Sequence, residues 1–211
     1  MAAGDRTKKI VGRVWAIIAD GGPNIPAPVD RESLIHGAIN DFQRRIAEEA
    51  LCVETSANLT VSSGTTSEPS GFFRFKLIAL PSGQTLQVEE LDLTEYDYIT
   101  RYSPTSFPQS PIYFKRWAGT LTFYPTPSNA TYTGYYWKIP STDVSTSVDP
   151  ETPAIFDKAI EYGVLSDIAA LVRKPDLIKI YHPLFLEELE RVKSSWRRTK
   201  RGSYDIYYHD L

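Results

Sequence analysis

The spacing of apolar residues changes twice along this chain of 211 residues. In residues 5–51, and again in residues 149–201, apolar residues recur three or four positions apart, as they do on amphipathic helices. Residues 53–140, between them, are rich in Tyr, Thr, Ser and Pro and alternate as strands do. The helical ends have only each other or the middle against which to bury their apolar faces. We therefore predict an α+β fold, a helical bundle with an inserted β-strand region (a hairpin or small sheet).

These segments are expected to form a single domain over residues 1–211. A chain of this length buries about 70% of the surface that its unfolded form exposes, so it needs no disulfide to stabilise a core. The single Cys52 excludes an internal disulfide and fits a reducing compartment. The predicted parts are a helical body of residues 5–51 and 149–201, a β insertion of residues 53–140, and a C-terminal arm of residues 202–211.

Two helices are predicted before the β region. Asp5 can cap the first helix, which is expected to stop at Asp20 because Gly-Gly-Pro follows. Asp30 can cap the second helix, which has charged residues on one side and an apolar stripe on the other. The residues of that stripe are Ile35, Ala38, Ile39, Phe42 and Ile46.

Two more helices are predicted after the β region. Thr152 as the cap, with Pro153 at the first helical position, marks the start of one, and Pro175 marks its end. The last helix spaces its apolar residues by three and four, but Pro183 would cost ~3 kcal/mol inside a helix. We therefore expect a kink or a fresh start at Pro183, and an end at Gly202. The apolar residues of this last helix are Phe185, Leu189, Val192 and Trp196.

Strands are predicted at residues 53–61, 72–80, 84–88, 120–124 and 131–138. In the second of these strands, one face should carry Phe73, Phe75 and Leu77.

Two stretches of the middle region are not predicted to be strands. Ser62–Gly71 is polar and has little to bury, so we expect a mobile excursion. Leu93–Tyr98 is expected to form a short helix capped by Thr94.

The side chains that catalysis or metal binding requires do not gather in the sequence. The three histidines lie far apart, and none has a second histidine, cysteine or carboxylate at the spacing of a metal site. Adjacent glutamates, such as Glu187 and Glu188, point in different directions on a helix, which is typical of solvated faces. We therefore expect no enzymatic activity, no cofactor and no metal. No apolar run reaches the ~20 residues that span a bilayer, so no membrane contact is expected.

Positive charge is concentrated near the end of the chain. Six cations in residues 191–201 exceed what a helix C-terminus needs to complement its dipole. Two interpretations weigh about evenly here. One is a helix end that complements its own dipole, and the other is a docking face for an acidic partner or for phosphates. The six cations are Arg191, Lys193, Arg197, Arg198, Lys200 and Arg201.

Large apolar side chains follow this basic cluster in the C-terminal arm. Ordering ten residues costs ~10–20 kcal/mol of backbone entropy, whereas burying five such side chains returns only ~8–15 kcal/mol. We therefore expect the free arm to be disordered and to become ordered only against a partner. The residues predicted to bind that partner are Arg197, Arg198, Arg201, Tyr204, Ile206, Tyr207, Tyr208 and Leu211.

Aromatic residues are concentrated in the predicted strands around Trp117 and Trp137. They could form a stacking platform for sugars or bases, which makes a carbohydrate-binding β module an alternative function. Aromatic cross-strand pairs within a small sheet are the favoured interpretation.

The order and spacing of several motifs resemble the head-to-tail adaptor (neck, connector or head completion) proteins of tailed bacteriophages. The resemblance covers residues 30–201. Its most characteristic part is a strand ending in Tyr-Pro-Thr-Pro, then a Tyr-rich return strand and a helix pair. The motifs are Leu34–Phe42 with Asn40 among apolar residues, Asp92–Thr94, Pro111–Phe114, Leu121–Pro127, Tyr132–Trp137 and the Ala-rich helix after Pro153.

The resemblance implies a structural virion protein that forms a ring, expected to be a dodecamer, under the portal and connects the DNA-filled head to the tail. The expected partners are other copies of the chain, the portal protein and the next neck or tail protein. The arm should bind the portal first and an adjacent subunit second. Genomic DNA would pass through the lumen without specific binding, which a net charge of −3 allows. Assembly in the host bacterial cytoplasm would place the protein in the virion neck. A tail-tube or tail-terminator subunit is a further alternative.

Overall fold

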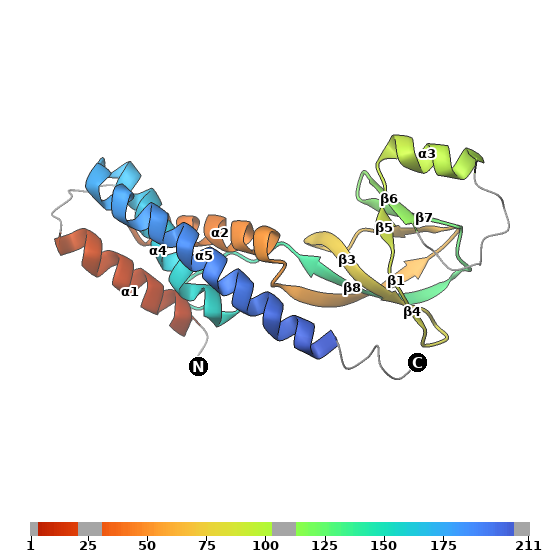
Figure 1. Cartoon of the computed structure of the whole chain (residues 1–211), viewed down its shortest axis with the longest axis horizontal. Helices are drawn as coiled ribbons and strands as arrows, with labels where there is room; N and C mark the ends of the chain where they lie inside the picture. Colours follow the sequence, from red (N-terminus) through yellow and green to blue (C-terminus); the bar gives the residue numbers. More distant parts are fainter. Residues whose placement is uncertain (1–3, 21–30, 103–112, 205–211) are drawn as a thin grey trace. The chain divides into compact units, whose positions relative to one another are not determined.

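The computed structural model describes residues 4–20, 31–102 and 113–204 (Figure 1). It is a mixed structure of helices and sheets, which is compatible with the predicted α+β class. The chain divides into two compact units. We call Met1–Val53 with Pro140–Leu211 the helical unit, and Glu54–Ile139 the β unit.

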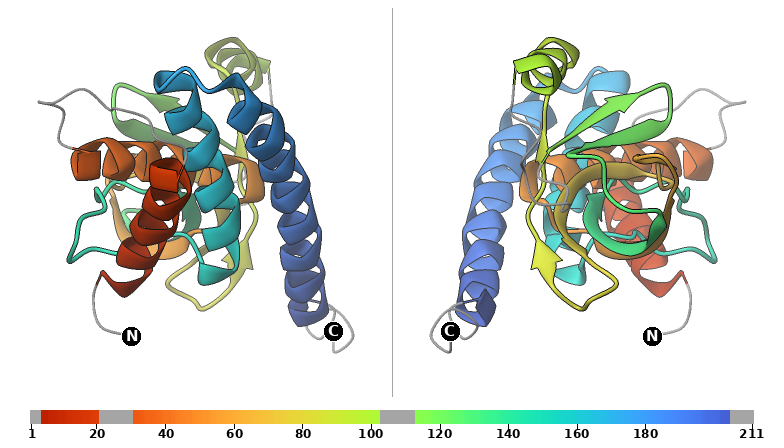
Figure 2. Two further views of the ribbon diagram at one scale, coloured as in Figure 1. Left: turned by 90° about the vertical axis from the view of Figure 1, so that its left-hand side faces the viewer. Right: turned by 90° about the vertical axis from the view of Figure 1, so that its right-hand side faces the viewer.

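The helical unit is built around α4. Its helices are α1 (Asp5–Asp20), α2 (Arg31–Ala50), the 3₁₀ turn η1 (Ala154–Phe156), α4 (Asp157–Leu171) and α5 (Pro175–Tyr204). Helix α4 packs against α1, α2 and α5, and it lies between α1 and α5 in Figure 2. Because neighbours surround α4, most of its residues are buried. The stripe predicted for α2 is buried at Ile35, Ile39, Phe42 and Ile46, in one core with Ile160 and Phe185.

Gly163 permits the close crossing of α2 and α4. A Cβ atom at this position would lie 2.4 Å from the ring of Phe42, closer than carbon atoms can approach. The same ring meets Phe185 edge to face, with 5.0 Å between centroids. One glycine therefore lets three helices share an aromatic contact in the core.

The first turn of α1 is capped by a residue 143 positions further along the chain. Asp149 Oδ1 accepts hydrogen bonds from the backbone N–H groups of Arg6 and Thr7, at 2.8 and 3.1 Å. The Arg6 guanidinium binds the Asp157 carboxylate and donates to the carbonyl oxygens of Pro150 and Thr152. These bonds attach α1 to the start of α4.

Two predicted helix boundaries are wrong, each for a physical reason. Thr152 is not the cap of α4: its hydroxyl is buried without a hydrogen-bond partner, and the 3₁₀ turn η1 precedes the helix. The last helix begins at Pro175, runs through Pro183 and continues to Tyr204, past Gly202. Pro183 is on an exposed face, where water can satisfy the carbonyl group that proline leaves unpaired.

The β unit contains two four-stranded sheets. One has the order β1 (Glu54–Val61), β8 (Ala130–Lys138), β3 (Phe72–Ala79) and β4 (Thr85–Leu86). The other has the order β2 (Thr65–Ser67), β7 (Thr120–Tyr124), β6 (Tyr113–Trp117) and β5 (Glu89–Glu90). All pairs are antiparallel except β5 with β6. Both sheets supply one core of aromatic and aliphatic residues: Leu59, Val61, Phe72, Phe75, Ile78, Phe114, Leu121, Phe123, Tyr132 and Tyr136.

The expected strands are present, but strands β2, β5 and β6 were not predicted and the face assignment for β3 is wrong. In β3 the buried residues are Phe72, Phe75 and Ile78, three positions apart, rather than alternate residues. The register against β8 shifts between Phe72 and Arg74 and again between Phe75 and Leu77. Each β-bulge inserts one residue into the alternation, so the side chain that faces the core changes.

The segment Ser62–Gly71 does not form the expected mobile excursion. It turns at Ser62, whose backbone pairs with Thr65, and then forms β2 against β7. The backbone N–H of Glu68 donates to Gly119 O at 2.8 Å, and the Glu68 carboxylate binds Arg116. The segment is held by backbone pairing and one ion pair, which compensate for its lack of apolar residues.

Candidate interaction surfaces

No metal-binding cluster is assembled in the described residues. In those residues no three His, Cys, Asp or Glu side chains converge on a point that could hold a metal ion. None of the described helices combines the length and apolar character that crossing a bilayer would require. Cys52 is buried. The features of the described surface that could serve a function are shallow hollows and exposed side chains.

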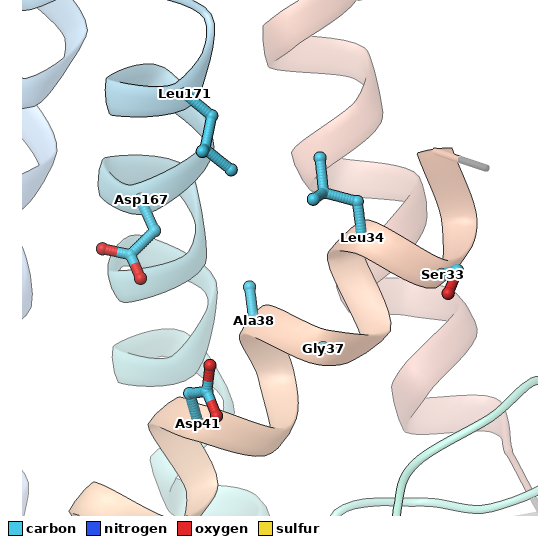
Figure 3. Close-up of a pocket in the computed structure, with 7 residues that line it drawn as sticks. All are labelled: Ser33, Leu34, Gly37, Ala38, Asp41, Asp167 and Leu171. Atoms are coloured by element: carbon cyan, nitrogen blue, oxygen red, sulfur yellow. The ribbon is translucent and has the colours of Figure 1, made fainter. Parts of the chain in front are cut away.

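A shallow hollow lies between α2 and α4 (Figure 3). Leu34 and Ala38 of α2 face Leu171 of α4 across it, and Leu171 is 63% exposed. Burial raises the pKa of Asp167, and the nearby charge of Asp41 adds to this shift, while Arg45 and His182 oppose it. The lining holds two carboxylates and the Ser33 hydroxyl, but no histidine or cysteine. The arrangement therefore suits packing against another side chain better than chemistry.

The basic cluster at the end of α5 is partly neutralised by its own helix. Arg191 pairs with Glu188, and Lys193 pairs with Glu190 and, at 3.6 Å, with Glu49 of α2. Hydrogen bonding from Arg191 lowers the pKa of Glu188 against the opposing effect of burial. These two cations are therefore structural, and they are not available to an external partner without breaking ion pairs.

Arg197 and Arg198 are the two predicted binding residues whose side chains the structure describes. Both are exposed, and neither forms an ion pair with a described residue. Arg198 only donates to the carbonyl oxygen of Ser194, at 3.3 Å. Between the paired and unpaired cations, Trp196 packs against Phe156 with 6.1 Å between ring centroids, so this part of α5 is anchored to the core.

The rest of the predicted binding arm stays a prediction. Arg201 and Tyr204 belong to α5, although their side chains are outside the described set. Ile206, Tyr207, Tyr208 and Leu211 lie outside the described residues altogether.

The aromatic strands do not form one platform. Trp117 lies in β6 and Trp137 in β8, which belong to different sheets. Five other rings of the β unit contact one another in its core, for example Phe75 with Phe114 at 5.1 Å between centroids; the five are Phe72, Phe75, Phe114, Phe123 and Tyr136. This favours the interpretation of the aromatic residues as cross-sheet packing. Trp117 is 65% exposed beside the β6–β7 turn.

Helix α3 (Leu93–Tyr102) carries an exposed surface that sequence reasoning missed. Its cap is Asp92 rather than Thr94, because Asp92 Oδ1 accepts from the N–H groups of Thr94 and Glu95 at 2.7 and 2.8 Å. The Asp92 N–H in turn donates to the Glu95 carboxylate, which completes a capping box. The Asp-x-x-Glu spacing was the signal that could have located this cap.

One side chain of α3 fixes which face of the helix points outward. Tyr96 is buried, and its hydroxyl donates to Phe123 O at 3.3 Å. Burial raises the pKa of Tyr96. The Lys115 ammonium lies 4.5 Å from the centroid of the Tyr96 ring and 3.7 Å from the Asp97 carboxylate. With Tyr96 inward, the residues Leu93, Tyr98 and Tyr102 remain exposed. We call these three residues the α3 face.

Acidic residues lie directly before α3 in the chain and in its first turn. Four exposed carboxylates stand in β5 and the first turn of α3, and none forms an ion pair with a described residue. Two cations are also near: Arg74 lines the same hollow as the two glutamates of β5, and Arg101 lines the same hollow as Tyr98 and Tyr102. The acidic rim consists of Glu89, Glu90, Asp92 and Glu95.

Comparison with known proteins identifies one relevant family. The family model described as SU10 adaptor protein matches residues 8–204. Among the described residues, this range covers α1 from Lys8 onward, α2 to α5 and β1 to β8. No curated protein matches the chain.

Proposed function

The chain belongs to the SU10 adaptor protein family and is thus a structural adaptor protein of a bacteriophage, and from this premise we propose that it forms a ring under the portal. The match to residues 8–204 is the observation that carries the proposal. The ring, expected to be twelve-fold, would connect the DNA-filled head to the tail in the neck of the virion, after assembly in the host bacterial cytoplasm.

Features of both units support an assembling role. Each unit has its own buried core, so surface contacts are free to serve other copies. Exposed large apolar side chains occur in both units, including Leu171 and Ile180 in the helical unit and Tyr98 and Trp117 in the β unit. A ring uses two different patches of each subunit in head-to-tail contacts that close under rotation. The exposed apolar residues named above can supply such patches.

The partners that follow from this role are the portal protein, the next neck or tail protein and genomic DNA. DNA would pass through the lumen without specific binding, because a net charge of −3 provides no excess of cations for phosphates. An image of the purified protein mixed with its portal protein, by negative-stain electron microscopy, tests the ring directly. A ring of density beneath the portal is expected, and a portal with no added density would overturn the proposal.

The C-terminal arm is proposed to attach the ring to the portal. Deleting Ser203–Leu211 should leave the free energy of unfolding unchanged and abolish capture of the chain by immobilised portal protein. A variant that replaces the same residues by a Gly/Ser segment of equal length is the matched control for chain length, and it should also fail to bind. Full binding by either variant would show that the arm is not the attachment point.

Two rival functions have separate tests. A carbohydrate-binding β module would bind on a glycan array, and alanine at Trp117 would remove that binding. A tail-tube or tail-terminator subunit would co-purify with tail-tube protein rather than with portal protein. The separation of Trp117 and Trp137 into different sheets speaks against the first rival.

A further inference from the structure

We propose that the α3 face of one copy, with its acidic rim, binds the basic end of α5 of a neighbouring copy. The proposal rests on the ring proposed above, and it names a pair of surfaces through which adjacent subunits would contact each other. The basic end is defined here by Arg197 and Arg198.

The α3 face has the character of a binding surface. Tyr98 is 65% exposed and Tyr102 is 72% exposed, and their rings lie 4.9 Å apart. With Leu93 they line a shallow hollow on the outward side of the helix. Tyrosine has few rotatable bonds, so it can contribute contact area at low entropic cost, and it is enriched among the residues that dominate binding energy. The capping box and buried Tyr96 hold the helix beneath these rings in a fixed orientation.

The charges of the two surfaces are complementary. Within the described residues, the other carboxylates of the β unit already have cations: Glu54 pairs with Lys76, and Glu68 pairs with Arg116. The unpaired acidic residues are therefore concentrated in the rim of the α3 face. On α5, Arg191 and Lys193 are paired with glutamates, whereas Arg197 and Arg198 form no ion pair with a described residue. A surface of exposed tyrosines among carboxylates is suited to guanidinium groups, which stack on aromatic rings and bind carboxylates at the same time.

The β unit contains an internal example of this contact. The Lys115 ammonium lies over the Tyr96 ring and beside the Asp97 carboxylate, on the inner side of the same helix. An arginine that approaches Tyr98 from outside would meet the same combination of ring and acidic side chain.

A second copy is the occupant that these observations favour. Every copy carries one acidic aromatic surface and one basic surface, so each can bind one neighbour on either side, which is the requirement for a closed ring. Two other occupants would give different results in the experiment below. In the first, the α3 face binds the basic end of α5 of the same chain. In the second, Arg197 and Arg198 bind the portal protein instead of a neighbouring copy.

Charge reversal in two separate chains tests the contact. Variant A is Glu89→Lys with Glu90→Lys, and variant B is Arg197→Glu with Arg198→Glu. Each pair of changes affects exposed side chains without ion pairs to described residues, so both variants should fold as the wild type does. Circular dichroism and thermal unfolding check this. The measurement is the number of copies bound per portal ring, by native mass spectrometry at fixed protein concentration.

Each variant alone should lose assembly, and an equal mixture should regain it. In a ring of A alone, arginines would meet lysines, and in a ring of B alone, glutamates would meet glutamates. Juxtaposed like charges should reduce occupancy by about tenfold or more. In a mixed ring, A and B alternate, and every contact again joins opposite charges. Recovery in the mixture supports the proposal, because contact within one chain cannot be restored by adding another chain.

The control reverses two exposed cations elsewhere in the helical unit, Lys8→Glu with Lys9→Glu. These changes should leave assembly intact, and in a mixture with A the rings should consist of the control variant, with A left out, because A still has no partner of opposite charge for its lysines. The aromatic contribution is tested by Tyr98→Ala with Tyr102→Ala, which should weaken assembly, whereas phenylalanine at both positions should retain most of it.

The outcomes separate the two proposals. If the wild-type chain forms no ring on the portal, the proposed ring is wrong and this contact falls with it. If the wild type assembles but the A and B mixture does not recover, the ring stands and the α3–α5 contact is overturned. Failure of B in every mixture, with A unaffected, would assign Arg197 and Arg198 to the portal instead.

Discussion

In the helical unit, buried polar side chains join segments that are far apart in the sequence, whereas the β unit joins its segments through backbone ladders and aromatic rings. Among the described residues, Thr66 is the only buried polar residue of the β unit. The helical unit has seven: Thr7, Asn40, Gln43, Thr152, Glu161, Ser166 and Glu188.

Three of the polar residues of the helical unit have a common task. Thr7, Asn40 and Gln43 attach the irregular segment between β8 and α4 to the helices. Asn40 Oδ1 accepts from the N–H of Val144 at 2.9 Å, and Gln43 Oε1 accepts from the N–H of Glu151 at 3.0 Å. A segment without strand or helix hydrogen bonds must satisfy its backbone by other means. In the β unit the strands satisfy most of each other's backbone groups, and side chains such as Asn129, whose Oδ1 accepts from the N–H of Ser63 at 2.8 Å, supplement them.

The comparison predicts that the β unit is most sensitive to the loss of ring volume. Phe114 is 1% exposed and contacts three other rings. Its replacement by alanine should lower the free energy of unfolding by about 3–5 kcal/mol. In the helical unit Ile160→Ala should cost about 2–5 kcal/mol. Denaturant unfolding measures both, and amide exchange reports which unit is affected. A change near zero at either position would show that it does not belong to a common core.

The next largest effect should come from the bonds between α1 and α4. Arg6→Ala removes an ion pair with Asp157 and two hydrogen bonds to carbonyl oxygens, and should cost about 2–3 kcal/mol. Arg13→Ala is the matched control, since Arg13 also pairs with an α4 carboxylate but has a side chain that is 66% exposed, and it should cost at most about 1 kcal/mol. Equal effects would mean that the partly buried bonds of Arg6 contribute no more than a surface pair.

A third change tests the attachment of the irregular segment. Asn40→Ala leaves the buried N–H of Val144 without its acceptor, which should cost about 1–3 kcal/mol. Asn40→Asp keeps an acceptor oxygen at that position and should cost less at low pH, where the carboxyl group is protonated. Thermal unfolding across pH measures the difference. Indistinguishable variants would contradict a role for the side-chain oxygen.

A pH effect is expected from the helical unit. The pKa of Glu188 is lowered in the folded chain by its hydrogen bond to Arg191. Its contribution to stability is therefore present above its ordinary value of 4.5 and is lost as the pH falls below that value. Glu188→Gln should lower stability at neutral pH and flatten this part of the acid limb. An unchanged acid limb would show that Glu188 does not contribute to it.

The smallest expected effect has the opposite sign. Thr152 buries a hydroxyl without a hydrogen-bond partner, so Thr152→Val should raise stability slightly, by about 0–1 kcal/mol. Thr7→Val is the contrasting control, because the Thr7 hydroxyl donates to Val148 O at 2.8 Å. The Thr7 change should lower stability. If both changes destabilise equally, the Thr152 hydroxyl has a partner that the structure does not show.

Local patterns predicted the helices better than the strands and their faces. The stripe of α2 and the apolar series of α5 could be identified because helix periodicity is a property of neighbouring residues. The face of β3 could not, because two bulges depend on its pairing with β8. The cap of α1 also escaped prediction, since Asp149 lies 143 residues away from Arg6 in the sequence. For the candidate surfaces, the sequence located the basic cluster but not which of its cations are paired.

The sequence by itself determined the change of period from helix to strand and back, the apolar stripes, the basic end of α5 and the motifs shared with phage adaptors. These depend on residue type and spacing along the chain. Only the tertiary structure decided that β7 and β8 enter different sheets, that Ser62–Gly71 is paired rather than mobile, and that Tyr96 turns inward so that Tyr98 and Tyr102 are exposed. Each of these depends on a partner distant in sequence, and the free energy of that contact outweighs local preference.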